Sequence, residues 1–374
     1  MATRTTSTPA DIRANNIMAA FDLLFPANTM TRSEIGRQLG ISRMAATEVT
    51  GEMLQEGIVR EIGEDTRTGR GKRSMVLGID TAHWRVLSVD LSEPYILKGA
   101  LIDLCGRIVN RAEIPNDADH VDFADVERLC AQLKEQAGGH DILGLGLAVP
   151  GIVDTQGTVV HAVYLGWSDF PARQRLEESL DIPVIVGNAT NAALLAERFF
   201  GEGSANSMLI RISADVGAAL CVNGQIVTGQ DFMAGEIGHI SVDPTGPDCG
   251  CGKRGCVEAY LSTTNLYAQI AADPTARLDI LTGAGQLLGR VMAVSLGLLN
   301  LHDVAIDAPP DIVGEAFLDG MRGELSAAMN TPHVHDAPLL HRCQVGSDAS
   351  LRGQAIDVIR ALVPTIRQRT DPGD

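Results

Sequence analysis

Three cysteines and one histidine stand close together in the second half of this 374-residue chain. Cys249, Cys251 and Cys256 fall within eight positions, and His239 precedes the first of them by ten positions. Three thiolates and one imidazole complete a tetrahedral Zn²⁺ shell and leave no open position for a catalytic water. The residue types and their spacing therefore predict a structural zinc site.

Glycines and carboxylates surround this cluster. Gly250, Gly252 and Gly255 lie between or beside the cysteines, where a loop that aims three sulfurs at one point needs freedom in φ. Glu236 precedes the histidine and Glu258 follows the last cysteine. The alternative is a disulfide or three unrelated buried thiols. Three cysteines cannot pair evenly, however, and nothing in the sequence is typical of a secreted protein.

The runs ExGH and CxCGxxGCxE, which contain these residues, resemble the signature of the ROK family of sugar repressors and sugar kinases. Further matching segments extend the resemblance over nearly the whole chain. It implies an actin-like, hexokinase-type α/β fold of two lobes, with sugar contacts from Asn188, Glu236, His239 and Glu258. His239 would then hold zinc through one ring nitrogen and a sugar hydroxyl through the other. The alternative is that the two glutamates only orient the zinc loop.

The same resemblance separates this chain from the kinases of the family. The phosphate-binding turn DxGGT appears here as DLSEP, in which Glu93 adds a negative charge and Pro94 removes an N–H donor. Ala189 occupies the place of the catalytic aspartate and can accept no proton. Asp215 stands in the second phosphate turn. We therefore predict that the chain is not an enzyme; a sugar kinase with an appended DNA-binding head is the alternative.

The first part of the chain has the pattern of a small helical domain. Apolar residues keep helical spacing over residues 11–25. Thr31 and Glu34 form a capping box for a second helix, Gly40 ends that helix, and Ser42 begins a third. Helix, tight turn and helix is the helix-turn-helix arrangement, whose second helix enters the major groove of DNA.

We expect Ala46, Val49 and Met53 of the third helix to face the core. The side chains expected to point outward toward the DNA are Ser42, Arg43, Thr47 and Thr50. Glu48, on the same helix, is unfavourable for contact with phosphates. Strands over 58–62 and 74–77 would form a wing that contacts DNA through Arg67, Arg70, Lys72 and Arg73. A helical protein-interaction domain with a solvated basic loop is the alternative.

Charge and composition limit the compartment and the partners. The net charge is −17, of which residues 1–75 carry +1 and the remainder −18. An acidic body does not exclude DNA binding by a near-neutral head. No apolar stretch is expected to span a membrane, and the N-terminus lacks the apolar core of a signal peptide. Seven cysteines, three of them in the metal-like cluster, indicate a reducing compartment, so we expect a cytoplasmic protein.

Together these features predict two domains. Residues 1–77 would be a winged helix-turn-helix, and residues 78–374 a ROK-type sugar-sensing domain, with a small lobe over about 80–186 plus the C-terminal helix and a large lobe over about 187–349. The predicted function is a transcriptional regulator, a repressor of carbohydrate metabolism genes that binds an operator and a small sugar. Because paired operator half-sites require a two-fold protein, we expect a homodimer or homotetramer. Control by docking of another protein is the alternative to a sugar.

Overall fold

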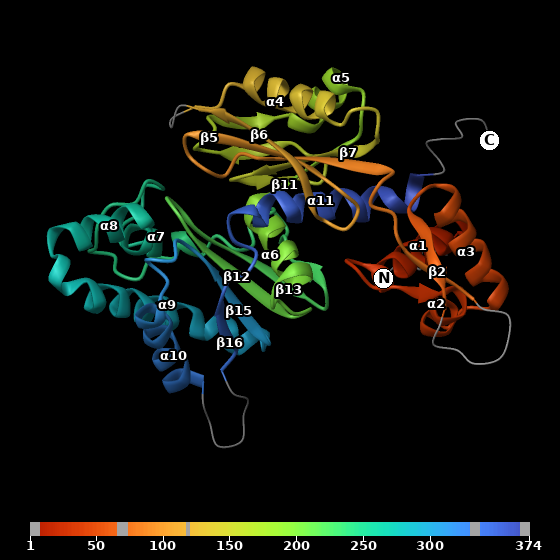
Figure 1. The fold of residues 1–374 in the computed structure, drawn as a ribbon. Coiled ribbons are helices and arrows are strands. Elements are labelled where there is room, and N and C mark those ends of the chain that lie inside the picture. Colours follow the sequence, from red (N-terminus) through yellow and green to blue (C-terminus); the bar gives the residue numbers. More distant parts are fainter. Residues whose placement is uncertain (1–7, 66–73, 117–119, 330–336, 367–374) are drawn as a thin grey trace. The chain divides into compact units, whose positions relative to one another are not determined.

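The computed structural model describes four stretches of the chain, residues 8–65, 74–116, 120–329 and 337–366. The chain divides into two compact units, each with its own five-stranded sheet (Figure 1). The first unit comprises residues 1–189 and 354–374, and the second comprises residues 190–353.

The first unit begins with a small domain, residues 8–79, called the head below. Its elements are α1 (Pro9–Leu24), β1 (Met30–Thr31), α2 (Arg32–Leu39), α3 (Arg43–Gln55), β2 (Val59–Glu64) and β3 (Met75–Ile79). The strands form an antiparallel sheet in the order β1-β3-β2. The predicted helix ends are confirmed, because Thr31 and Glu34 form the capping box, Gly40 lies at φ +66°, and Ser42 caps α3.

Buried side chains from all three helices hold the head together. Phe21, Ile35 and Met53 are at most 2% exposed, and burying side chains of this size contributes about 1.5–3 kcal/mol each. Helices α2 and α3 cross closely, since a Cβ added at Gly36 would lie 2.9 Å from Cβ of Ala46. This packing fixes the rotation of α3 about its own axis.

The rest of the first unit is a mixed sheet with helices packed on it. Its main elements are β4 (Trp84–Asp90), β5 (Ile96–Ile102), β6 (Ile108–Pro115), α4 (Phe123–Gln136), β7 (Asp141–Val149), α5 (Ala172–Leu180) and β11 (Val184–Asn188). The strand order is β11-β7-β4-β5-β6, with β11, β7 and β4 parallel and β5 and β6 antiparallel. A small second sheet consists of β8 (Ile152–Val153), β9 (Val159–Ala162) and β10 (Trp167–Phe170). Helices α4 and α5 lie side by side on one face of the main sheet (Figure 1).

The C-terminal helix α11 (Ala349–Leu362) joins this sheet to the head. Glycines of β7 make room for it, since a Cβ at Gly146 would lie 2.7 Å from Cγ of Gln354. The short helix η4 (Val363–Thr365) follows α11 and packs against α1. An ion pair of 2.6 Å between Arg360 and Asp22 of α1 adds to this contact.

The second unit is a sheet of order β14-β13-β12-β15-β16 with helices on both faces. Its strands are β12 (Ser207–Ile212), β13 (Val216–Val222), β14 (Gln225–Ile226), β15 (Asp303–Asp307) and β16 (Leu339–Arg342). Its helices are α6 (Ala189–Phe200), η1 (Ile237–His239), α7 (Val257–Leu261), α8 (Thr263–Ala272), η2 (Pro274–Ala276), α9 (Arg277–Leu299), α10 (Glu315–Met329) and η3 (Gly346–Asp348). Side chains alternate along β12, so Ile210 packs with α9 and α10 while Leu209 packs with α6.

Helix α9 is more apolar than the sequence analysis expected. Together with η2 it forms a helix, Pro274–Leu299, whose length and mean hydropathy of 1.2 would suffice to cross a membrane, which corrects the expectation that no stretch is so apolar. In the structure it packs tightly on α10, because a Cβ at Gly285 would lie 1.9 Å from the carbonyl oxygen of Phe317. Core helices of globular proteins meet the same length and hydropathy criteria, so the feature is weak evidence for a membrane.

Candidate functional site

The four predicted metal ligands come together in the second unit. One ligand atom from each of His239, Cys249, Cys251 and Cys256 lies within 4.8 Å of the other three. Sγ of Cys249 is 3.8 Å from Nδ1 of His239, and Sγ of Cys251 is 3.7 Å from Sγ of Cys256. All three cysteines are free, so the disulfide alternative does not apply. This group of side chains could hold a metal ion.

Short pieces of structure aim these side chains. His239 is the last residue of η1, and Cys256 directly precedes α7. Cys249 and Cys251 lie on a tight turn, which is closed by the Cys249 N–H donating to the carbonyl oxygen of Lys253 at 2.9 Å.

Two of the three nearby glycines are required by the backbone. Gly255 lies at φ +62°, and a Cβ there would come within 1.7 Å of the carbonyl oxygen of Asp243. Gly252 lies at φ +86°. Gly250 has neither a positive φ nor a close neighbour, so the prediction that all three glycines are needed is correct for two of them.

The three thiols differ in their pKa. Burial raises the pKa of Cys249 to about 12 and also raises that of Cys256, whereas the backbone N–H of Lys253 lowers the pKa of Cys251. Thiolates are the form that binds metal, so a metal ion would displace the protons of these thiols.

The two glutamates lie near this cluster. Glu258 accepts a hydrogen bond from the Val216 N–H at 3.3 Å, and its other oxygen is 3.7 Å from Sγ of Cys249. Glu236 reaches solvent, yet neighbouring atoms remove part of its hydration and raise the pKa of its carboxyl; His239 opposes this rise, while Asp215 and Glu258 add to it. The charges of His239 and Glu258 thus act on the carboxyl of Glu236.

Asn188, the fourth predicted sugar contact, belongs to the first unit. It is the last residue of β11, and its side-chain amide donates to the carbonyl oxygen of Gly151 at 2.9 Å. Ala189 begins α6 and is buried.

The two turns that would bind phosphate in a kinase hold internal contacts instead. Between β4 and β5, Glu93 forms an ion pair with Lys98, and the carbonyl of Glu93 accepts from the Tyr164 hydroxyl at 3.4 Å. Between β12 and β13, the exposed Asp215 accepts a hydrogen bond from the Ser213 hydroxyl. Each turn therefore contains a carboxylate that is engaged by a neighbouring side chain.

In the head, α3 exposes most of the predicted DNA contacts. Ser42, Arg43 and Thr47 are exposed. Thr50 is fully buried, and its hydroxyl donates to the carbonyl oxygen of Ala46 at 2.7 Å, so the prediction that it points outward is wrong. A residue four positions after Ala46 shares its side of the helix. The predicted wing contacts Arg67, Arg70, Lys72 and Arg73 lie outside the described residues.

The sequence analysis missed Met44, an apolar side chain that is 73% exposed at the start of α3. Glu48, one turn further along, is also exposed. Because the two are four positions apart, they are neighbours on the helix surface. The sequence could have predicted this exposure, because helical periodicity places Met44 and Glu48 on the side of the helix opposite Ala46 and Met53, which were expected to face the core.

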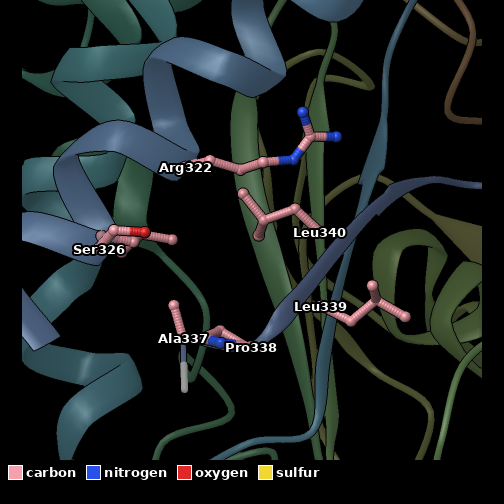
Figure 2. A pocket seen from close by; sticks show the side chains of 7 residues that line it. Arg322, Ser326, Ala337, Pro338, Leu339 and Leu340 are labelled. Atoms are coloured by element: carbon pink, nitrogen blue, oxygen red, sulfur yellow. The ribbon is translucent and has the colours of Figure 1, made fainter. Parts of the chain in front are cut away.

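A cavity of about 380 Å³ lies elsewhere in the second unit (Figure 2). Its lining comes from α10, from β16 and from the two residues before β16, and includes Arg322, Ser326 and Leu340. It contains none of the described side chains that were predicted to bind metal, sugar or DNA.

Comparison with known proteins identifies both a sugar kinase and transcriptional repressors among the relatives of this chain. The model of the ROK family matches residues 87–285. A glucokinase of Halalkalibacterium halodurans is 39% identical over 186 residues, covering 47% of this chain and 56% of that protein. The xylose repressor of Bacillus subtilis is 28% identical over 252 residues, covering 64% of each chain. The DNA-binding transcriptional repressor Mlc of Escherichia coli is 25% identical over 351 residues, covering 83% of this chain and 86% of that one.

Among solved structures, a ROK family transcriptional regulator described as a homologue of E. coli Mlc has the same fold. The TM-score is 0.80 with 21% identity, over 97% of this chain and 100% of that chain. The present chain spans less than two thirds of the glucokinase and of the xylose repressor.

Proposed function

The chain belongs to the ROK family, and we propose that it is a transcriptional regulator, a repressor of carbohydrate metabolism genes that senses a sugar without phosphorylating it. Residues 1–77 are a winged helix-turn-helix that binds an operator, and residues 78–374 are the sensing body. The observation that carries this proposal is the head itself, in which α2, the left-handed Gly40 and α3 precede the ROK-type body. Sugar phosphorylation has no use for such a domain.

Three observations support the DNA-binding residues proposed for the head. The packing of α3 leaves Ser42, Arg43 and Thr47 exposed in its first turns, where a recognition helix meets base edges. The basic segment with Arg67, Arg70, Lys72 and Arg73 would contact phosphates or the minor groove. Similarity to a relative named as a DNA-binding transcriptional repressor, 86% of whose length is matched, favours the same role.

The absence of kinase activity is supported by the nucleotide-handling residues. The exposed Asp215 would repel a phosphate, and Glu93 occupies the ammonium of Lys98, so the pair leaves no net positive charge to attract one. Ala189 leaves no carboxylate to accept the proton of a sugar hydroxyl. A glucokinase among the relatives keeps a sugar kinase with a DNA-binding head as the second candidate.

We assign Zn²⁺ to the His239, Cys249, Cys251 and Cys256 group. With Zn–S distances of about 2.3 Å, neighbouring sulfurs in a tetrahedral site lie about 3.8 Å apart. The 3.7 Å separation of the Cys251 and Cys256 sulfurs fits this geometry. The 3.8 Å between Sγ of Cys249 and Nδ1 of His239 is close to the sulfur–nitrogen separation of about 3.5 Å that a Zn–N distance of about 2.0–2.1 Å gives. Four protein ligands fill the tetrahedron, so the ion would be structural, and it would hold the loop that carries the sugar-binding carboxylates.

The effector is a small sugar or sugar derivative. Glu236 and Glu258 offer carboxylate oxygens to adjacent hydroxyls, and His239 offers its second ring nitrogen. The resemblance to the ROK family adds Asn188 of the first unit as a further proposed sugar contact. Through these contacts a sugar would favour one arrangement of the body over another and so change operator affinity.

A dimer is required if the operator has two half-sites, and we propose that α9 forms its interface. Val291, Val294 and Leu298 form an apolar stripe, and the last two are 71% and 81% exposed. The nearby Arg290 is paired with Glu324 of α10, which reduces the charge that a second copy of the stripe would meet. Leu298→Glu should give monomers in sedimentation experiments; an unchanged dimer would exclude this interface. We also propose that the protein is cytoplasmic, because its free thiols fit a reducing compartment.

The test is selection of genomic DNA by the purified full-length protein, followed by a screen of monosaccharides for release of the recovered fragments. Arg43→Glu should abolish selection. Glu236→Gln with Glu258→Gln should keep selection but lose release by sugar. Sugar-dependent ATP consumption by the wild type would favour the kinase candidate instead. Release by none of the sugars would favour control by a docked protein.

A further inference from the structure

The outer face of α3 contains more than the positively charged and hydroxyl side chains expected on a DNA-binding helix. Met44 and Glu48 lie at its centre, opposite the buried Ala46 and Met53. Met44 is 73% exposed, and within the described residues the exposed side chain of Glu48 makes neither a hydrogen bond nor an ion pair. Thr47, another exposed side chain of this region, already donates its hydroxyl to the carbonyl oxygen of Arg43 at 2.8 Å.

Gly51, on the same line of the helix one turn beyond Glu48, is a second observation. A Cβ added there would meet nothing within 4 Å, so packing within the chain does not require glycine. Glycine in a helix interior costs roughly 0.5–1 kcal/mol relative to alanine. The helix therefore gives up stability for a bare backbone on its exposed face, which a closely approaching partner surface would explain.

We propose that Met44 and Glu48 read bases directly in the major groove, and that Gly51 gives the duplex room to approach. This inference rests on the proposed DNA-binding function. The carboxylate of Glu48 would accept a hydrogen bond from the 4-amino group of cytosine. Adenine also offers an amino group there, but its neighbouring N7 is an acceptor and would repel a carboxylate. A glutamate that faces the phosphates would weaken DNA binding by charge repulsion. The same glutamate at the floor of the major groove would favour a C·G pair.

Met44 supplies the complementary apolar contact. In the major groove thymine alone presents a methyl group, which apolar side chains contact. Four residues of helix rise about 6 Å, and successive base pairs are about 3.4 Å apart, so the two contacts fall within about two base-pair steps. Each half-site should therefore contain a cytosine and, one or two positions away, a thymine.

The experiment is selection from a random double-stranded library by the full-length protein, for the wild type and the variants Glu48→Gln, Met44→Ala, Gly51→Ala and Gln55→Ala. Glutamine pairs with adenine, so Glu48→Gln should change one selected position per half-site from C to A by about tenfold or more. Met44→Ala should reduce the preference for thymine at a nearby position several-fold. Gln55→Ala, exposed at the far end of the same helix, is the control and should select the wild-type motif.

Gly51→Ala distinguishes a binding role from a structural one. It should raise the unfolding temperature of the free protein and weaken binding to the selected site. If the Glu48 and Met44 variants select the wild-type motif unchanged, the inference is wrong although the proposed function stands. If the wild type selects no motif at all, the proposed function fails, and this inference fails with it.

Discussion

The metal loop and helix α3 position their functional side chains in opposite ways. Between His239 and Cys256 the loop has only isolated bridges, Ser241 with Cys256 and Asp248 with Arg254, and most of its residues are exposed. Single hydrogen bonds, such as that from the Lys253 ammonium to the carbonyl oxygen of His239, connect its parts, and a metal ion on the four ligand side chains would join its two ends. Helix α3 is instead fixed by buried side chains on its inner face, such as Met53. The exposed residues on its outer face can be substituted without disturbing this packing.

This difference decides which kind of function can be predicted from a sequence. A metal site is defined by residue type and spacing, both of which are visible in the chain. A base-reading surface is defined by which side of a helix faces outward, and that depends on packing. The metal site should lose its ion, and with it the structure of the loop, when one ligand is replaced. A substitution on the base-reading surface should instead change the preference at one base pair only.

The largest effect is expected from Cys256→Ser. Cys256 is fully buried among the ligands, and a hydroxyl does not replace a thiolate as a zinc ligand. Because structural zinc sites contribute roughly 10–16 kcal/mol of apparent binding free energy in small domains, the loop should unfold. Elemental analysis should find no zinc, and sugar should no longer release DNA, while the head still binds its operator.

Cys130→Ser is the matched control. Cys130 is equally buried, but it lies on α4 in the first unit, far from the ligands in sequence. This variant should lose some stability and keep one zinc per chain. If the Cys256→Ser variant also contains one zinc per chain, the metal loop does not depend on all four ligands, and the proposed difference between this loop and helix α3 is wrong.

The next effect concerns the inner face of α3. Met53→Ala should destabilise the head by about 2–5 kcal/mol, because it leaves a cavity among buried side chains. Binding to every DNA sequence should weaken together, and the zinc content should not change. Hydrogen exchange of head amides measures the loss. Met44→Ala on the same helix is the control, since an exposed methionine contributes little to stability; equal losses in the two variants would contradict the assigned rotation of α3.

Much of the fold could be predicted because local signals agree with tertiary structure. The capping box at Thr31 and the left-handed Gly40 both appear as expected. The four metal ligands also converge as their spacing predicts.

The missed elements lacked such signals. Strand β6 has exposed polar residues at its centre, including Asn110 and Arg111, and therefore resembles a loop. Strand β15 (Asp303–Asp307) is a short apolar run that follows the apolar α9, where periodicity alone cannot separate strand from helix. In the same way, Thr50 was misplaced because a threonine near the middle of α3 is polar enough to suggest an outward position, and only the packing shows that it is buried.

The smallest effect is expected from Thr50→Val, and it tests the rotation of α3 most directly. Valine keeps the shape of threonine and removes the hydrogen bond to the Ala46 carbonyl, which still accepts the helical N–H. Stability should change by no more than about 1 kcal/mol. Because the side chain is fully buried, base preference should not change in library selection. Thr47→Val, an equivalent change on an exposed position, should alter affinity or preference. If Thr50→Val changes the selected bases and Thr47→Val does not, α3 presents a different side to DNA, and the roles assigned to Met44 and Glu48 fall with that rotation.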